Sequence, residues 1–186
     1  MSPFEFVFSL FGLLLGFSLV EVLGGLARTL EGRLRLGPAY RVGWLTPLLA
    51  TFVMLDLITF WLAAWRLRDH LTVTGLSLTA CLAYAGSYYL AAHLVFPPRD
   101  VEAPDLDAHG LRVKHWVLGI LFALFVVQVS YFLSVPALAG MLRDPWAIGS
   151  VLLFALLLAS AALVRGRQLA IALLAALILR YVIAMF

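Results

Sequence analysis

Long apolar runs alternate with short polar connections along the whole chain. Six of these runs are long enough to span a bilayer, because a helix needs about 20 mostly apolar residues to cross the hydrocarbon core. They cover residues 4–27, 43–65, 71–96, 113–135, 146–164 and 167–186. Helix-breaking pairs such as Gly37-Pro38 and Pro97-Pro98 lie in the connections. The pattern predicts an all-α polytopic integral membrane protein, a single domain over residues 1–186 with six transmembrane helices in a compact bundle.

Composition supports this fold class and excludes several functions. Hydrophobic residues make up 64% of the 186 residues and charged residues only 12%, whereas charged residues approach a quarter of a soluble domain. The net charge of +3 is spread over the connections, which is typical of membrane orientation and not of nucleic-acid binding. The single cysteine, Cys81, allows neither an internal disulfide nor a paired-cysteine metal motif. Membrane lipids are the expected surroundings, and no cofactor site is predicted.

The basic residues near the helix ends predict the orientation. The first, third and fifth connections carry Arg28, Arg33, Arg35, Arg41, Arg99, Arg112, Lys114, Arg165 and Arg167. The second and fourth carry only Arg66, Arg68 and Arg143. Because cytoplasmic loops are enriched in Lys and Arg, both termini are expected on the non-cytoplasmic side. In a bacterium this corresponds to a multi-pass protein of the inner (cytoplasmic) membrane.

Three polar side chains lie deep inside separate predicted helices. At a rise of about 1.5 Å per residue, Asp56, Gln128 and Arg180 all lie roughly 20 Å from the predicted cytoplasmic end. A buried arginine requires an anionic neighbour, so we expect an Asp56–Arg180 pair supported by Gln128. Such a pair can be a substrate or proton site, or a clamp that fixes helix register. Alternatively, Arg180 lies close enough to the C-terminus to extend toward the headgroups.

A second polar layer is expected near the cytoplasmic face. Glu21 lies about 25 Å down the first helix, and His93 lies near the end of the third. Glu21 and Arg28 share a helical face, so their pairing at the boundary is the simpler interpretation. The functional alternative is a protonatable Glu21–His93 gate at the inner mouth of a pathway that leads to Asp56.

Acidic residues cluster only in the predicted cytoplasmic loop, residues 97–112. Its potential metal ligands are Asp100, Glu102, Asp105, Asp107 and His109. Solvated loop charge is the simpler interpretation, and Asp105 could instead cap a short surface helix. His93 and His115 both lie at the predicted cytoplasmic edge of the membrane, but a single pair of histidines near the surface is weak evidence for haem binding.

Small residues predict where helices approach closely. Gly12 and Gly16 form a small-x-x-x-small pattern in the first helix. The partner could be a helix of the same chain or of a second copy, so a homo-oligomer through this face is one expectation.

These features lead to two main functional hypotheses. The first is a small transporter or channel for a proton, an ion or a small polar solute, with Asp56, Arg180, Gln128, Glu21 and His93 as its binding residues. The second is a structural or assembly protein whose Asp–Arg pair only locks the bundle. A membrane enzyme or a metal-dependent protein acting at the acidic loop is a third class. The absence of a nucleophile beside a base, and of a glycine-rich phosphate loop, argues against an enzyme.

Overall fold

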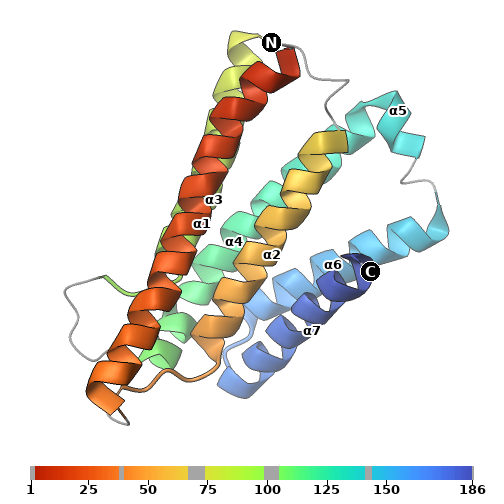
Figure 1. Ribbon diagram of the computed structural model, residues 1–186. Helices are drawn as coiled ribbons and strands as arrows, with labels where there is room; N and C mark the ends of the chain where they lie inside the picture. The colour runs from red at the N-terminus through yellow and green to blue at the C-terminus, as the bar shows by residue number, and fades with distance from the viewer. Residues whose placement is uncertain (1–2, 38–39, 67–73, 99–104, 141–143, 186) are drawn as a thin grey trace.

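A computed structural model describes residues 3–37, 40–66, 74–98, 105–140 and 144–185 (Figure 1). Within these ranges the chain forms seven helices and no strands. They are α1 (Pro3–Leu36), α2 (Leu45–Arg66), α3 (Gly75–Leu94), α4 (Leu106–Ser134), α5 (Pro136–Ala139), α6 (Pro145–Leu163) and α7 (Arg167–Met185). The all-helical fold predicted from the apolar runs is confirmed, and one long helix overlaps each of the six predicted runs.

Five of the long helices are long and apolar enough to cross a membrane: α1, α2, α4, α6 and α7. The exception is α3, which carries tyrosines, serines, a threonine and a histidine among its apolar residues. These polar side chains lower its hydropathy, although its 20 residues match the length of a span. Five apolar helices suggest a multi-pass membrane protein.

Two helix boundaries differ from the prediction because polar residues extend the helices beyond the apolar runs. α1 continues to Leu36, where Gly37 adopts a φ of 57° and Arg33 Nη1 donates to the Gly37 carbonyl at 2.8 Å. α4 begins at Leu106, because the Asp105 side chain accepts a hydrogen bond from Ala108 N at 3.1 Å. The predicted loop 97–112 therefore ends seven residues early, and Asp105 caps α4 itself. The one-turn helix α5 was not predicted.

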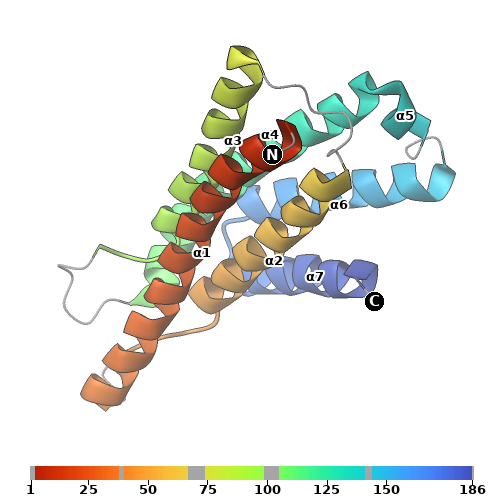
Figure 2. The ribbon, with the colours of Figure 1, turned by 45° about the horizontal axis from the view of Figure 1, so that its top comes forward.

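The bundle has two central helices between two helix pairs. α1 packs on α3 at one side, α6 packs on α7 at the other, and α2 and α4 lie between them (Figure 1). Figure 2 shows that the α6–α7 pair is inclined to the α1–α3 pair. Consecutive long helices run in opposite directions, as short connections require. α2 contacts α1, α3, α4 and α7, which surrounds the middle of this helix with side chains from four others.

The core follows from this central position of α2. Leu45, Leu49, Phe52 and Val53 are completely buried along its length. They meet fully buried residues of other helices, which include Val22, Ala92, Leu118, Leu158, Leu174 and Leu177. A charged side chain on the same helix consequently lies inside the bundle and must find its partners there.

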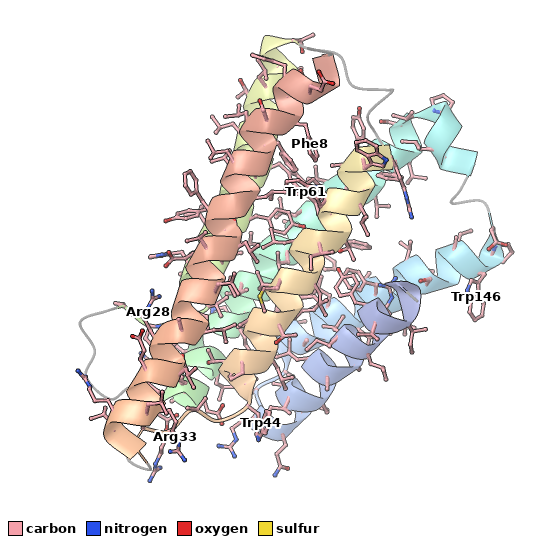
Figure 3. All side chains as sticks on the ribbon, in the orientation of Figure 1. Phe8, Arg28, Arg33, Trp44, Trp61 and Trp146 are labelled. Carbon is pink, nitrogen blue, oxygen red and sulfur yellow. The ribbon has the colours of Figure 1, made fainter. Side chains whose placement is uncertain are left out.

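The outer surface is rich in large apolar side chains. Leu13, Val20, Leu30, Trp146, Leu152, Leu156, Leu179 and Ile183 are all exposed. A soluble monomer rarely exposes apolar residues on this scale, so the surface is suited to lipid tails. Arg28, Arg33 and Trp44 lie toward one end of the bundle and Trp61 and Trp146 away from it (Figure 3). We call the end formed by the last turns of α1, α3 and α6 and the first turns of α2, α4 and α7 the basic end.

The basic end collects most of the Lys and Arg residues that the orientation prediction used. Those with a described position are Arg28, Arg33, Arg35, Arg41, Arg112, Lys114, Arg165 and Arg167. At the opposite end only Arg66 has one, and Arg68, Arg99 and Arg143 lie outside the described residues. Both chain termini point away from the basic end (Figure 1). The charge asymmetry on which the predicted orientation depends is therefore a property of the folded bundle.

The first glycine of the α1 pair, Gly12, lies against another helix of the same chain. A Cβ on Gly12 would lie 3.1 Å from Trp61 Cη2, so Gly12 lets α2 approach α1. The Trp61 ring also meets Phe8 edge-on, with centroids 4.8 Å apart. Among the described residues, apart from its chain neighbours and the α1 backbone, no atom lies within 4 Å of the corresponding position at Gly16. This glycine instead lines a shallow apolar groove between α1 and α2.

Candidate functional site

Asp56 is held at the centre of the bundle by two tyrosines from different helices. The residue is only 9% exposed. Tyr88 of α3 donates its hydroxyl to Asp56 Oδ2 at 2.8 Å, and Tyr181 of α7 donates to Oδ1. Each carboxylate oxygen therefore accepts one hydroxyl donor, and the interaction joins α2, α3 and α7. Hydrogen bonds of this kind offset part of the cost of burying a carboxylate.

Arg180 has a different set of partners from the one predicted. Its Nη2 donates to the Ser150 carbonyl at 3.2 Å and to Ser150 Oγ at 2.9 Å. Its guanidinium carbon lies 4.6 Å from the centroid of the Phe154 ring, in cation–π contact. Among the described residues, no ion pair joins Arg180 to Asp56. The expected Asp56–Arg180 pair is therefore wrong as a direct contact.

The geometry of α7 explains this correction. Consecutive helical residues project about 100° apart around the axis, so adjacent side chains cannot both face α2. Tyr181 faces Asp56, and Arg180 is consequently directed to α6, where the Ser150 oxygens accept its hydrogen bonds. Arg180 also does not extend toward the headgroups, because its Nη2 is bound inside the bundle.

Asp56, Gln128 and Arg180 nevertheless line one cavity, as their common depth predicts. This Asp56 cavity has a volume of about 290 Å³. Its polar lining consists of Asp56, Thr59, Arg66, Tyr88, Gln128, Arg180 and Tyr181, and apolar side chains of α4 and α6 complete it. The lining follows α2 from Asp56 to Arg66, the last residue of that helix. The cavity therefore extends from the buried carboxylate toward the end of the bundle opposite the basic end.

Glu21 and His93 meet near the basic end. His93 Nδ1 lies 3.1 Å from Glu21 Oε1, with the His93 side chain 62% exposed. Together with Arg28 and His109 they line a second cavity, the Glu21 cavity, of about 600 Å³. No Glu21–Arg28 ion pair forms in the described part of the chain. The simpler interpretation, in which Glu21 pairs with Arg28, is therefore wrong, and the two residues of the predicted gate are in contact.

Buried apolar residues of α4 lie between the residues of that helix that line the two cavities. On α4, Val113 lines the Glu21 cavity and Leu121 lines the Asp56 cavity. Between them Val117 and Leu118 are completely buried. Eight residues of helix correspond to about 12 Å. The described lining residues of the two cavities do not overlap, although adjacent residues of α3, Tyr88 and Tyr89, line one cavity each.

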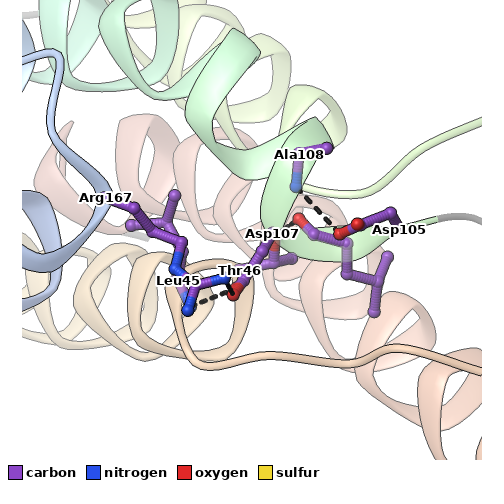
Figure 4. A network of polar contacts seen from close by, with 7 residues as sticks. Leu45, Thr46, Asp105, Asp107, Ala108 and Arg167 are labelled. Carbon is purple, nitrogen blue, oxygen red and sulfur yellow. Dashed lines mark hydrogen bonds and ion pairs between the residues drawn. The ribbon is translucent and has the colours of Figure 1, made fainter.

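The described acidic residues of the predicted loop hold helices together. Asp107 accepts a hydrogen bond from Leu45 N at 2.9 Å and contacts Arg167 Nη1 at 3.3 Å (Figure 4). It is mostly buried, which corrects the interpretation of Asp107 as solvated loop charge. Gly43, at a φ of 62°, packs directly against this carboxylate, and no larger residue would fit. The Asp107 contacts join the starts of α2, α4 and α7.

The metal-ligand hypothesis finds little support in this region. His109 Nε2 lies 3.2 Å from the Leu94 carbonyl oxygen at the end of α3, and Asp105 caps α4. The described residues contain no group of three or more His, Cys, Asp or Glu side chains that could hold a metal ion. Asp100 and Glu102, the other predicted ligands, lie outside the described residues.

Sequence reasoning missed several residues of the site. From the sequence, no role at Asp56 was predicted for Tyr88, Tyr181 or Ser150. A tyrosine in an apolar helix was the available signal, because a buried hydroxyl requires a partner. Lys114 entered the sequence analysis only as one of the basic residues near the helix ends. It is buried, and its Nζ donates to the Ala161 and Ala162 carbonyls at 2.9 and 3.0 Å, where it satisfies the end of α6.

Comparisons of the chain with known protein families, with curated proteins and with solved structures find no match. A functional proposal therefore depends on the site itself.

Proposed function

We propose that this protein is a multi-pass protein of the inner (cytoplasmic) membrane that transports or conducts a small polar solute, an ion or a proton. Asp56, Arg180 and Gln128 form its central site, and Glu21 with His93 forms the inner gate. In this proposal the basic end faces the cytoplasm, in keeping with the excess of Lys and Arg there.

One observation carries the proposal: an acid and a base line the same cavity without neutralising each other. A carboxylate and a guanidinium that only lock a bundle would be expected to pair directly, because an ion pair reduces the cost of burying both charges. Here Asp56 is bound by tyrosines and Arg180 by a serine, and both still face the Asp56 cavity. A concave site with a few convergent polar groups inside an apolar bundle is typical of solute binding.

The two cavities favour a transporter over an open channel. One leads from Asp56 toward the opposite end, the other lies at the basic end beside Glu21 and His93, and buried apolar residues of α4 lie between the residues of that helix that line them. In this proposal a solute passes from one cavity to the other when the packing between them changes, as in alternating access. Glu21 and His93 can exchange a proton during such a change.

Flux into proteoliposomes tests the proposal. The purified protein is reconstituted, and swelling in glycerol, urea and glycine and proton entry with an internal pH dye are recorded. We expect flux of at least one probe, reduced by about tenfold or more in Asp56→Asn, because the carboxylate's charge-assisted contacts are lost. Asp144→Asn is the matched control, since Asp144 caps α6 without lining the cavity and asparagine caps equally well.

The structural alternative has its own supporting observation. Asp56 joins α2, α3 and α7 through two hydroxyls, and this arrangement would lock the bundle even in the absence of a solute. A folded protein that moves none of the four probes, together with a large loss of stability in Asp56→Asn, would favour this alternative and contradict transport.

We also propose that a second copy of the chain packs along α1 at Gly16. The groove beside this glycine is apolar and lined by α1 and α2 residues, which include Leu19 and Ile58. Gly16→Leu should reduce the dimer fraction measured by light scattering in detergent. An unchanged mass would remove this face as the contact.

A further inference from the structure

The Asp56 cavity contains hydrogen-bond donors that lack acceptors. Arg180 uses Nη2 for both of its contacts with Ser150. Its Nε is buried and finds no acceptor among the described residues. An unpaired buried donor costs free energy, and natural proteins usually satisfy such a group with a protein partner, water or a ligand. The Arg180 side chain lines the cavity, so its guanidinium, with an unpaired Nε, is a group that an acceptor bound in the cavity would satisfy.

Other donors line the same cavity. The Gln128 amide and the Arg66 guanidinium form no hydrogen bond or ion pair within the described part of the chain. Arginine offers donors in a planar fork that matches a carboxylate or phosphate group. Two guanidinium groups face a single carboxylate in the lining, so its charge favours an anion.

Asp56 supplies a hydrogen-bond acceptor in the same cavity. Each of its oxygens accepts one tyrosine hydroxyl, and a carboxylate oxygen has room to accept a second donor. A ligand with a hydroxyl or ammonium group could therefore donate to Asp56. A ligand with positive charge alone would instead meet the repulsion of Arg180 and Arg66.

We infer that the Asp56 cavity binds a small organic acid, with its anionic group on the Arg180 guanidinium and a hydrogen-bond donor of the same molecule directed to Asp56. This inference depends on the proposed function, in that the cavity is a solute site. The volume of about 290 Å³ lies at the lower end of the range for ligand pockets, so a small hydroxy acid or amino acid fits.

Three small probe molecules test which ligand charge the cavity prefers. Glycolate, glycine and ethanolamine are similar in size, and each carries a hydrogen-bond donor. Near neutral pH glycolate is an anion, glycine a zwitterion and ethanolamine a cation. Binding to the full chain in lipid nanodiscs is measured by titration calorimetry. We expect glycolate or glycine to bind and ethanolamine to bind at least about tenfold more weakly, as the loss of a charge-assisted contact implies. Equal or tighter binding of ethanolamine, or binding of none of the three, overturns the inference.

Substitution of the arginine tests the position. Arg180→Gln should weaken binding of the carboxylate by about tenfold or more. Arg165→Gln removes the same charge at the exposed end of α6 and should leave the affinity unchanged. Wild-type affinity in Arg180→Gln overturns the assignment to Arg180.

A measurement on the unsubstituted protein removes any dependence on how the variant folds. The arginine reagent 2,3-butanedione is applied with and without glycolate, and adducts are located by peptide mass spectrometry. Glycolate should protect Arg180 and leave Arg165 equally modified. Equal modification of Arg180 with and without glycolate contradicts the inference.

The two proposals fail in different ways. Flux of glycerol, urea or protons that depends on Asp56, without binding of any carboxylate, would overturn the inference and leave the proposed function intact. Carboxylate binding at Arg180 without flux of any probe would uphold the inference and overturn transport.

Discussion

Removal of single tyrosine hydroxyls tests how Asp56 is stabilised. The chain offers three buried or half-buried tyrosines whose hydroxyls have defined acceptors. Tyr88 and Tyr181 donate to the Asp56 carboxylate, whereas Tyr84 donates to the Leu124 backbone carbonyl at 3.1 Å. Phenylalanine keeps each ring, including the stacking of Tyr181 on Phe52, and removes only the hydroxyl. The three substitutions leave different acceptors behind, and Tyr84 also lies beside Tyr88, with ring centroids 5.7 Å apart.

The expected costs follow from these acceptors. A hydrogen bond to a charged group contributes about 1.5–3 kcal/mol, so Tyr88→Phe and Tyr181→Phe should each lower the free energy of unfolding by about 2 kcal/mol. The carbonyl of Leu124 lies inside α4, where the helix also provides it with a backbone donor. Neutral side-chain hydrogen bonds between membrane helices average about 0.6 kcal/mol, so Tyr84→Phe should cost less than about 1 kcal/mol.

The measurement is reversible unfolding in lipid–detergent micelles titrated with SDS and followed by tryptophan fluorescence. Repeating Tyr88→Phe in an Asp56→Asn background completes a double-mutant cycle. The cost should fall to that of a neutral hydrogen bond, which gives a coupling energy of about 1–2 kcal/mol. Equal costs for Tyr84→Phe and Tyr88→Phe, or a coupling energy near zero, would refute the idea that a buried carboxylate is the important acceptor.

Further predictions concern the packing of the bundle and use the same unfolding measurement. Asp107→Asn should lower the free energy of unfolding by about 1.5–3 kcal/mol, because Asp107 is buried. Arg167→Gln should lower it by less than about 1 kcal/mol, because the Arg167 side chain is 61% exposed. Equal costs for the two substitutions would contradict this assignment. Gly25→Ala should destabilise by more than about 1 kcal/mol, because its Cβ would collide with the Phe96 ring. Gly119→Ala, with open space around it, should be neutral or slightly stabilising, and an unaffected Gly25→Ala would show that the ring moves aside.

The sequence predicted helices well where apolar runs define them and less well where polar residues continue them. The last turns of α1 contain arginines and a glutamate, which form helix readily but do not resemble a membrane span. The first turns of α4 were assigned to a loop because their acids and histidine resemble a solvated connection. In both places the helix is ended or begun by capping, through Gly37 in α1 and Asp105 in α4.

At the candidate site, the sequence predicted the depth of the polar side chains in the bundle but not the direction in which each one points. Asp56, Gln128 and Arg180 were expected at one height, and they line one cavity. The hydrogen-bond partner of Asp56 differs from the predicted one, because Tyr181 and not Arg180 faces Asp56. For Glu21 the sequence favoured a neighbour on its own helix, and the structure brings His93 from α3 instead.

The sequence by itself determined which segments are apolar helices, the charge asymmetry between their ends and the height of each polar group. These properties depend on residue order alone, since the rise along a helix is the same for every residue. Only the tertiary structure decided which polar groups touch, because the rotation of each helix about its axis is set by packing against its neighbours. A rotation of one residue, about 100°, is enough to give Asp56 a tyrosine and Arg180 a serine.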